Sequence, residues 1–251
     1  MSKRGTLNQR HVRIGAIALY LGCCWLPLTA QAQSYHPSTV RFDVPGITED
    51  NPPSYQLAVN AKVFWMFSAV VQPTVETAQF IQYMKIAPGE KVLDMGTGSG
   101  VLAVLAAETA SVVVATDISQ LAVDNARHNA YQHGVDGKVD VRMGDLFSAI
   151  GGDERFDVIL FNIGNPLDNA TGETAPAYWA LHERFLSQAK HYLTTHGRIY
   201  YHGGFLDNIP RSREMMTRYG LRIVEMHMWT ANKINSEPLL FVLQAIPEPQ
   251  P

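Results

Sequence analysis

Hydrophobic and polar residues form blocks along the chain that predict strands and helices in alternation. Continuous apolar runs are typical of strands that are buried on both faces of a parallel sheet. Five such runs end near Leu93, Asp117, Arg142, Asn162 and Tyr201. Apolar residues at helical spacing occupy most of the segments between them. The alternation predicts an α/β fold with a doubly wound, mostly parallel sheet and helices on both faces.

Several residues mark the ends of these elements. Ser119 is expected to cap a helix over 120–133, and Gly134 is expected to end it. A later helix over 177–193 is expected to end at His196-Gly197. The late apolar runs that close the domain are 221–228 and 239–244.

Three glycines at alternate positions join the first predicted strand to a helix that begins at Val101. They are Gly96, Gly98 and Gly100. A glycine turn lets a ligand approach bare backbone, and it points the free N–H groups of the helix start at that ligand. Both properties suit a nucleotide-like cofactor. A short glycine motif alone also fits an ordinary turn between a strand and a helix.

Two acidic residues favour a ligand site over an ordinary turn. Asp94 ends the first strand, where a carboxylate would repel a pyrophosphate but accept hydrogen bonds from a cationic or hydroxyl-bearing ligand. Asp117 ends the next strand, 21 residues after Gly96, and is placed to bind two ribose hydroxyls. The dinucleotide fingerprint requires a third glycine five positions after the first, where this chain has Val101. A dinucleotide-dependent oxidoreductase is therefore disfavoured.

The glycine turn and the acid after it resemble the Rossmann-like methyltransferases that use S-adenosyl-L-methionine. The shared series is Asp94, Gly96, Gly98 and Gly100, followed by Asp117. The resemblance extends over about residues 73–245 and implies that S-adenosyl-L-methionine is the cofactor. It also implies a seven-stranded sheet whose last strand is reversed.

The resemblance assigns cofactor contacts to residues at four strand ends. These are Asp94, Gly96, Thr97, Gly98 and Gly100, then Asp117 and Ile118, then Asp145 and Leu146, and finally Asn162. In the family, the glycine turn passes the methionine part and the second acid holds the ribose. An acid at the position of Asp145 binds the adenine amino group, and the apolar residue beside it lies on the ring. By itself, Asp145 also fits a turn acid that binds local N–H groups.

The fourth strand ends at Asn162, where the glutamine-N5 and related amino methyltransferases carry Asn-Pro-Pro-Tyr or Asn-Pro-Pro-Phe. There the asparagine and a backbone carbonyl hold the NH₂ that is methylated, and the ring stacks on a planar substrate. Here the series reads Asn162-Ile163-Gly164-Asn165, so only the asparagine is kept. We expect Asn162 to orient the acceptor; the alternative is a turn residue that binds its own backbone.

His202 follows the fifth predicted strand, at a tip that is expected to face the cleft. A histidine there could act as a general base near neutral pH. The remaining histidines of this half do not predict a metal site, because no pair has a helical ligand spacing with an acid partner. They are His182, His191, His196 and His227.

The N-terminus has the pattern of a secretory leader. Basic residues up to Arg13 precede an apolar run over 14–28, and the small residues of Ala30-Gln31-Ala32 predict cleavage after Ala32. The run is short for a membrane span, and the alternative is a buried N-terminal helix. We expect a leader over 1–32, an extension or cap over 33–71, a methyltransferase domain over 72–246 and a flexible tail over 247–251.

Composition constrains the partners and the compartment. A net charge of −3 does not predict binding to nucleic acid by bulk charge, although a local basic groove stays open. Both cysteines, Cys23 and Cys24, lie in the predicted leader, so the mature chain would have no disulfide. A functional leader implies the bacterial periplasm or secretion. The alternative is the cytoplasm, where S-adenosylmethionine is made.

The sequence therefore supports two functional hypotheses. The first is a methyltransferase that transfers the methyl group to a nitrogen or oxygen nucleophile of a small molecule, peptide or protein. The second is an exported, catalytically silent protein that binds a small molecule such as a nucleoside on the same fold. The sequence leaves the acceptor and the oligomeric state open.

Overall fold

The computed structural model describes residues 53–163, 175–205, 209–228 and 238–247. The predicted leader, the first part of the predicted extension, Gly164 with Asn165, and residues 248–251 of the predicted tail lie outside this description. Within these ranges, no helix has the length and hydrophobicity that a membrane span requires.

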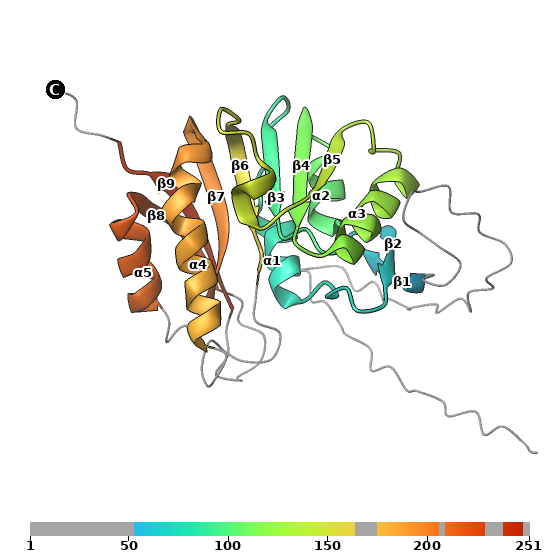
Figure 1. The fold of residues 1–251 in the computed structure, drawn as a ribbon, viewed down its shortest axis with the longest axis horizontal. Helices are drawn as coiled ribbons and strands as arrows, with labels where there is room; N and C mark the ends of the chain where they lie inside the picture. The colour runs from blue at the N-terminus through green and yellow to red at the C-terminus, as the bar shows by residue number, and fades with distance from the viewer. Residues whose placement is uncertain (1–52, 164–174, 206–208, 229–237, 248–251) are drawn as a thin grey trace, which may run out of the picture.

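A seven-stranded sheet forms the centre of the molecule (Figure 1), with the strand order β5-β4-β3-β6-β7-β9-β8. Neighbouring strands from β5 to β7 are parallel, whereas β9 is antiparallel to both of its neighbours. The strands are β3 (Lys91–Met95), β4 (Val112–Asp117), β5 (Val139–Met143), β6 (Phe156–Phe161), β7 (Leu193–Phe205), β8 (Leu221–Met228) and β9 (Pro238–Ala245). The predicted mostly parallel sheet with a reversed last strand is confirmed.

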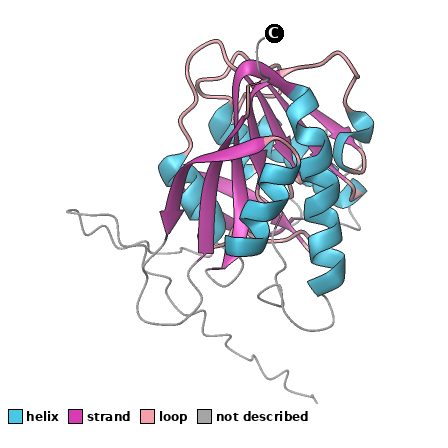
Figure 2. Cartoon of the chain, turned by 90° about the vertical axis from the view of Figure 1, so that its left-hand side faces the viewer, coloured by secondary structure: helices cyan, strands magenta, loops and turns pink. Residues whose placement is uncertain are grey.

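Helices cover both faces of this sheet (Figure 2). Because side chains alternate along a strand, a central strand such as β3 supplies two hydrophobic cores: Val92 packs with the first group of helices and Leu93 with the second. The first group is α1 (Val75–Tyr83), α2 (Val101–Ala106) and α3 (Gln120–Gln132). The second group is α4 (Ala175–Ala189) and α5 (Ile209–Arg218), with the 3₁₀ turns η2 (Leu146–Ala149) and η3 (Lys190–Tyr192).

The predicted ends of α3 are confirmed. The Ser119 hydroxyl accepts a hydrogen bond from the N–H of Ala122 at 3.4 Å, and Gly134 has a φ of 65° after the last turn. The predicted end of the later helix is wrong: α4 stops at Ala189, and both His196 and Gly197 lie inside β7.

Glycine can end a helix, but it can also let two strands approach closely, and Gly197 has the second role. A Cβ at Gly197 would lie 2.8 Å from the carbonyl oxygen of Phe156 on the neighbouring strand. The sequence shows the glycine but not the strand that approaches it.

The chain before α1 forms a hairpin of β1 (Pro53–Val59) and β2 (Lys62–Phe67) that packs on α3. Two fully buried asparagines of α3 hold the β2 backbone. Asn125 accepts from the N–H of Phe67 at 3.0 Å and donates to the carbonyl of Trp65 at 2.8 Å. Asn129 accepts from the N–H of Trp65 and donates to its carbonyl, both at 2.8 Å.

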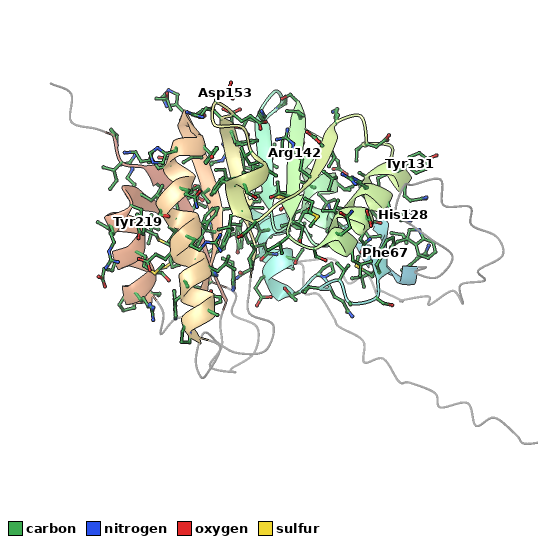
Figure 3. The ribbon with its side chains drawn as sticks, in the orientation of Figure 1. Phe67, His128, Tyr131, Arg142, Asp153 and Tyr219 are labelled. Carbon is green, nitrogen blue, oxygen red and sulfur yellow. The ribbon has the colours of Figure 1, made fainter. Side chains whose placement is uncertain are left out.

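The side chains of β2 complete the core beneath α3. Phe64, Met66 and Phe67 are almost fully buried, and the ring of Phe67 lies 5.7 Å from that of His128 on α3 (Figure 3). The aromatic cluster of the predicted extension therefore covers one end of the core. The segment that follows β2 passes the glycine turn, since the carbonyl oxygen of Val71 lies 3.9 Å from where a Cβ on Gly98 would be.

Replacing Asn125 with alanine should loosen the hairpin. The substitution leaves the buried N–H of Phe67 without its partner, which costs about 1–3 kcal/mol of unfolding free energy. Urea unfolding measures this loss, and Gln132→Ala, an exposed amide on the same helix, is the matched control. Equal stability of the two variants would contradict the role given to Asn125.

Candidate functional site

The carboxyl ends of β5, β4, β3 and β6 meet at one edge of the sheet, in that spatial order. Open α/β sheets bind ligands at this edge. The ten predicted cofactor residues lie at the ends of these four strands or in the turns that follow them. The fold therefore brings together residues that are far apart in the sequence.

The three glycines of the first turn all have left-handed φ angles, but their missing side chains serve different neighbours. A Cβ at Gly96 would lie 2.5 Å from Cγ1 of Ile163, and a Cβ at Gly100 would lie 2.8 Å from Cα of Ala126 on α3. By contrast, a Cβ at Gly98 would have no neighbour closer than the carbonyl oxygen of Val71, at 3.9 Å, so this side of Gly98 is open. The turn therefore offers bare backbone to a ligand at Gly98.

The side chain of Asp94 stabilises this turn through a buried hydrogen bond. Its carboxylate is 1% exposed and accepts the hydroxyl of Thr97 at 2.7 Å. Burial raises the pKa of Asp94 to about 6, against the lowering effect of the Thr97 hydroxyl and the Ala103 N–H. The carboxylate thus shapes the loop, and its direct contact with a ligand stays a prediction.

Asp117 joins the ends of two strands. One carboxylate oxygen accepts the N–H of Gly98 at 2.9 Å, and the other accepts the N–H of Ser119 at 2.9 Å. A carboxylate has about four lone-pair sites, so each oxygen can accept a further hydroxyl. Asp117 is half-buried beside the open face of Gly98, which is where the prediction placed a ribose-binding acid.

The next two turns carry three further predicted cofactor contacts, of which Asp145 and Leu146 are the predicted adenine contacts. Ile118 is 66% exposed, so its apolar side chain is accessible to a ligand. Leu146 is buried and has a φ of 49°, a left-handed conformation that is rare outside glycine. Asp145 is paired with Arg184 of α4 at 2.7 Å, so this acid already has a cationic partner. Arg184 was not predicted as a site residue, because its place in the sequence of α4 gives no indication of the contact with Asp145.

Asn162 leaves β6 toward α1. Its amide nitrogen donates to the hydroxyl of Thr77 at 3.1 Å, and that hydroxyl also accepts the N–H of Thr74 at 3.2 Å. The contact holds the amide nitrogen and leaves the carbonyl oxygen as the end that an N–H or O–H group of an acceptor can reach. Thr77 was not predicted as a partner of Asn162, because the two residues are 85 positions apart in the sequence.

The prediction that His202 sits at a strand tip is wrong: β7 continues to Phe205, and His202 pairs with Leu240 inside it. His202 is 3% exposed, and its Nδ1 has no hydrogen-bond partner among the described residues. Burial lowers the pKa of His202, and the nearby carboxylate of Glu76 opposes that shift. Because Phe161 pairs with Tyr201, the next residues are neighbours: Asn162, directly after β6, and His202, in β7, both face α1.

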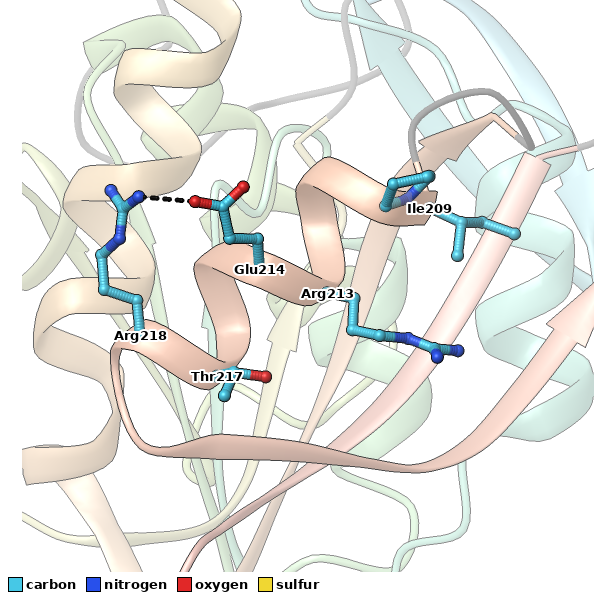
Figure 4. Close-up of a pocket in the computed structure, with 6 residues that line it drawn as sticks. Ile209, Arg213, Glu214, Thr217 and Arg218 are labelled. Atoms are coloured by element: carbon cyan, nitrogen blue, oxygen red, sulfur yellow. Dashed lines mark hydrogen bonds and ion pairs between the residues drawn. The ribbon is translucent and has the colours of Figure 1, made fainter.

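A surface hollow lies on α5 (Figure 4). Its walls include Ile209, Arg213 and Thr217, with an ion pair of 2.9 Å between Glu214 and Arg218. None of the predicted site residues contributes to it. In the described parts of the chain, no three His, Cys, Asp or Glu side chains are grouped as metal ligands.

The buried Asp94 should make stability depend on pH. Its pKa is raised in the folded protein, so it stabilises the fold below its unfolded pKa and loses that contribution as pH rises through about 6. Asp94→Asn should therefore gain stability relative to wild type by up to roughly 3 kcal/mol between about pH 4 and pH 7. Urea unfolding at both pH values measures the difference. The exposed Asp153→Asn is the control, and a pH-independent difference for Asp94→Asn would contradict the analysis.

Comparison with known proteins gives curated relatives that match this part of the chain. A ribosomal protein uL3 glutamine methyltransferase of Bradyrhizobium diazoefficiens is 47% identical over 75 residues, which cover 29% of this chain and 23% of the relative. A ribosomal protein L11 methyltransferase of Geobacillus thermodenitrificans is 34% identical over 142 residues, which cover 54% of this chain and 44% of the relative. The chain thus matches less than half of the length of either relative.

A solved structure and a family model agree with these matches. The structure of a ribosomal protein L11 methylase from Lactobacillus delbrueckii subsp. bulgaricus has a TM-score of 0.53 and 21% identity, and the match covers 68% of this chain and 77% of that one. This similarity supports the fold. The family model described as methyltransferase small domain matches residues 66–202, which is more than half of the chain. The chain therefore belongs to the methyltransferase small domain family.

Proposed function

We propose that the protein is an S-adenosyl-L-methionine-dependent methyltransferase that transfers the methyl group to a nitrogen or oxygen nucleophile. The proposal rests on one observation above others: Asp117 binds the N–H of Gly98 beside the open face of the glycine turn. This places an acid with spare acceptor sites next to exposed backbone, at the edge of the sheet where nucleotides bind. The family membership supports the same proposal.

The residues at this edge suit the parts of the cofactor. Asp117 would accept the ribose hydroxyls, and the backbone near Gly98 would lie along the methionine part. The exposed Ile118 and the buried Leu146 would contact the adenine ring. Asp145 would accept the adenine amino group on the oxygen positions that Arg184 leaves open.

The remaining residues would handle the acceptor. The cofactor supplies an electrophilic methyl group whose leaving group is a neutral thioether, so the protein contributes mainly proximity and orientation. Asn162, with its amide nitrogen held by Thr77, would accept a hydrogen bond from the attacking group. His202 is neutral near pH 7 because burial lowers its pKa, and a neutral imidazole can accept the proton that the acceptor loses.

We propose a nitrogen of a peptide or protein as the acceptor class. The names of two relatives support this choice, since one is a glutamine methyltransferase of ribosomal protein uL3 and another of a release factor. Asn162, the residue that the amino methyltransferases use to hold an NH₂ group, is kept in this chain. A small-molecule nitrogen or a nucleic acid base would use the same oxygen of Asn162.

A second candidate function is a nucleoside-binding protein without turnover. The side chain of Ile163, at the position of the first proline in the family motif, packs against Gly96 and closes that part of the glycine turn. Such a protein would bind the cofactor or its demethylated product but transfer no methyl group. Binding and turnover therefore have to be measured separately.

The substitution Gly98→Val should abolish cofactor binding. A valine at this φ of 55° is strained, and its side chain fills the open face of the turn. Isothermal titration calorimetry should show an affinity for S-adenosyl-L-methionine that is weaker by about hundredfold or more, or about 2.7 kcal/mol. Gly134→Val is the matched control, because Gly134 also has a left-handed φ and open space but lies at the end of α3. Undiminished binding by Gly98→Val would show that the ligand site lies elsewhere.

The substitution Asn162→Ala should separate binding from turnover. It removes the acceptor-facing oxygen and one of the ten predicted cofactor contacts but leaves the glycine turn and Asp117 intact, so cofactor affinity should fall much less than turnover. Methyl transfer from labelled S-adenosyl-L-methionine to a pool of bacterial peptides should fall about hundredfold, as expected for loss of one orienting group. Gln132→Ala is the exposed amide control. Binding without transfer by the wild-type protein would favour the second candidate function.

A further inference from the structure

The chain after β6 lacks the two prolines that follow the asparagine in the amino methyltransferases. Proline fixes φ, so their loss would leave this turn with more conformations. The buried side chain of His182 contacts this turn at Ile163. Nε2 of His182, on α4, lies 3.2 Å from the carbonyl oxygen of Ile163. The contact ties the end of β6 to the helix on the face opposite α1.

The hydrogen bonds of His182 have a fixed direction. A carbonyl oxygen only accepts, so Nε2 must carry the proton that it donates to Ile163. Nδ1 then accepts from the hydroxyl of Tyr201. Burial lowers the pKa of His182 to about 3, so the ring is neutral near pH 7 and has one proton. Burial raises the pKa of Tyr201, so its hydroxyl stays protonated as a donor.

Aromatic rings hold the imidazole in place. The side chain of His182 has no exposed surface. Phe161 and Tyr201 stand nearly perpendicular to it, at centroid distances of 5.1 and 5.3 Å. Tyr178 and Trp179 lie at 4.0 and 6.2 Å. An imidazole enclosed in this way is confined to a single position, and so is the peptide group that it binds.

We propose that His182 is a positioning residue for methyl transfer, which fixes the Asn162-Ile163 turn in place of the missing prolines. His182 holds the turn from the α4 side, and Thr77 holds the Asn162 amide from the α1 side. The Asn162 oxygen then keeps one orientation toward the acceptor. This inference rests on the proposed function, and it gives His182 no contact with the acceptor or the cofactor.

The test compares two nucleosides, because the acceptor is unidentified. Sinefungin carries an amine-bearing carbon in place of the methylsulfonium group, whereas S-adenosylhomocysteine has neither the amine nor the methyl group. The ratio of their dissociation constants, from calorimetry, reports on the groups that face the transferred methyl group. Wild type should prefer sinefungin by about tenfold, because its amine donates a charge-assisted hydrogen bond to the Asn162 oxygen.

His182→Leu should lose most of this preference while its affinity for S-adenosylhomocysteine stays within about twofold, since the turn moves but the ribose site does not. His182→Gln, which keeps a donor near the Nε2 position, should restore the preference. His191→Leu, the same change at an exposed histidine beyond α4, is the control. A wild-type ratio in His182→Leu, or no preference in wild type, would overturn the inference. Failure of wild type to bind either nucleoside would instead overturn the proposed function.

A second measurement covers the case that His182→Leu does not fold. The ¹⁵N shifts of the His182 ring in wild type should show the tautomer that is protonated at Nε2 near neutral pH. Tyr201→Phe removes the donor to Nδ1 but keeps the Ile163 carbonyl, so the ring should remain protonated at Nε2 in this variant. A ring protonated at Nδ1 in wild type would overturn the inference, because it could not donate to Ile163 through Nε2.

Discussion

The hydrogen bond from the N–H of Gly98 to the carboxylate of Asp117 is the contact on which the site depends. It joins the turn after β3 to the end of β4, so that the one open face of the glycine turn lies beside an acid. The N–H groups of Gly96 and Thr97 bind the carbonyl of Thr116 at 2.8 and 2.9 Å, so the backbone strengthens the same junction. Without this junction, the acid and the bare backbone would not form one surface.

Buried side chains also hold the backbone of segments next to this junction. Asn125 and Asn129 act as substitutes for a neighbouring strand along β2, and Asn129 also donates to the carbonyl of Ser99 at 2.8 Å. At the end of β6, Thr77 and His182 hold one turn from opposite faces. A buried polar group is costly unless its partners are in place, so each of these contacts specifies a single arrangement of the loop that it binds.

Local patterns predicted most of the sheet and its order of elements. The apolar runs of β3, β4 and β6 are continuous, and the cap at Ser119 and the glycine after α3 both act locally. The end of α4 was missed because Gly197 meets a neighbouring strand that no local pattern reveals. The hairpin of β1 and β2 was predicted only as part of an extension or cap, because β2 is held by the amide side chains of α3 and no local pattern shows that contact.

Local patterns likewise predicted some residues of the site but not their contacts. Strand-end acids such as Asp117 can be found from their spacing to the glycine turn, whereas their partners in space cannot. Arg184 and His182 lie in one helix with no motif of their own, and their roles appear only when α4 packs against the strand ends. The depth of His202 within β7 depends on pairing with β9, more than 30 residues later in the chain.

A crystal structure with S-adenosylhomocysteine tests the central claim most directly. The account predicts that the ribose hydroxyls bind the carboxylate of Asp117 and that the chain of the amino acid part passes the open face of Gly98. A nucleoside bound elsewhere, or a site in which Ile163 and its neighbours close the edge of the sheet after ligand has been added, would contradict it.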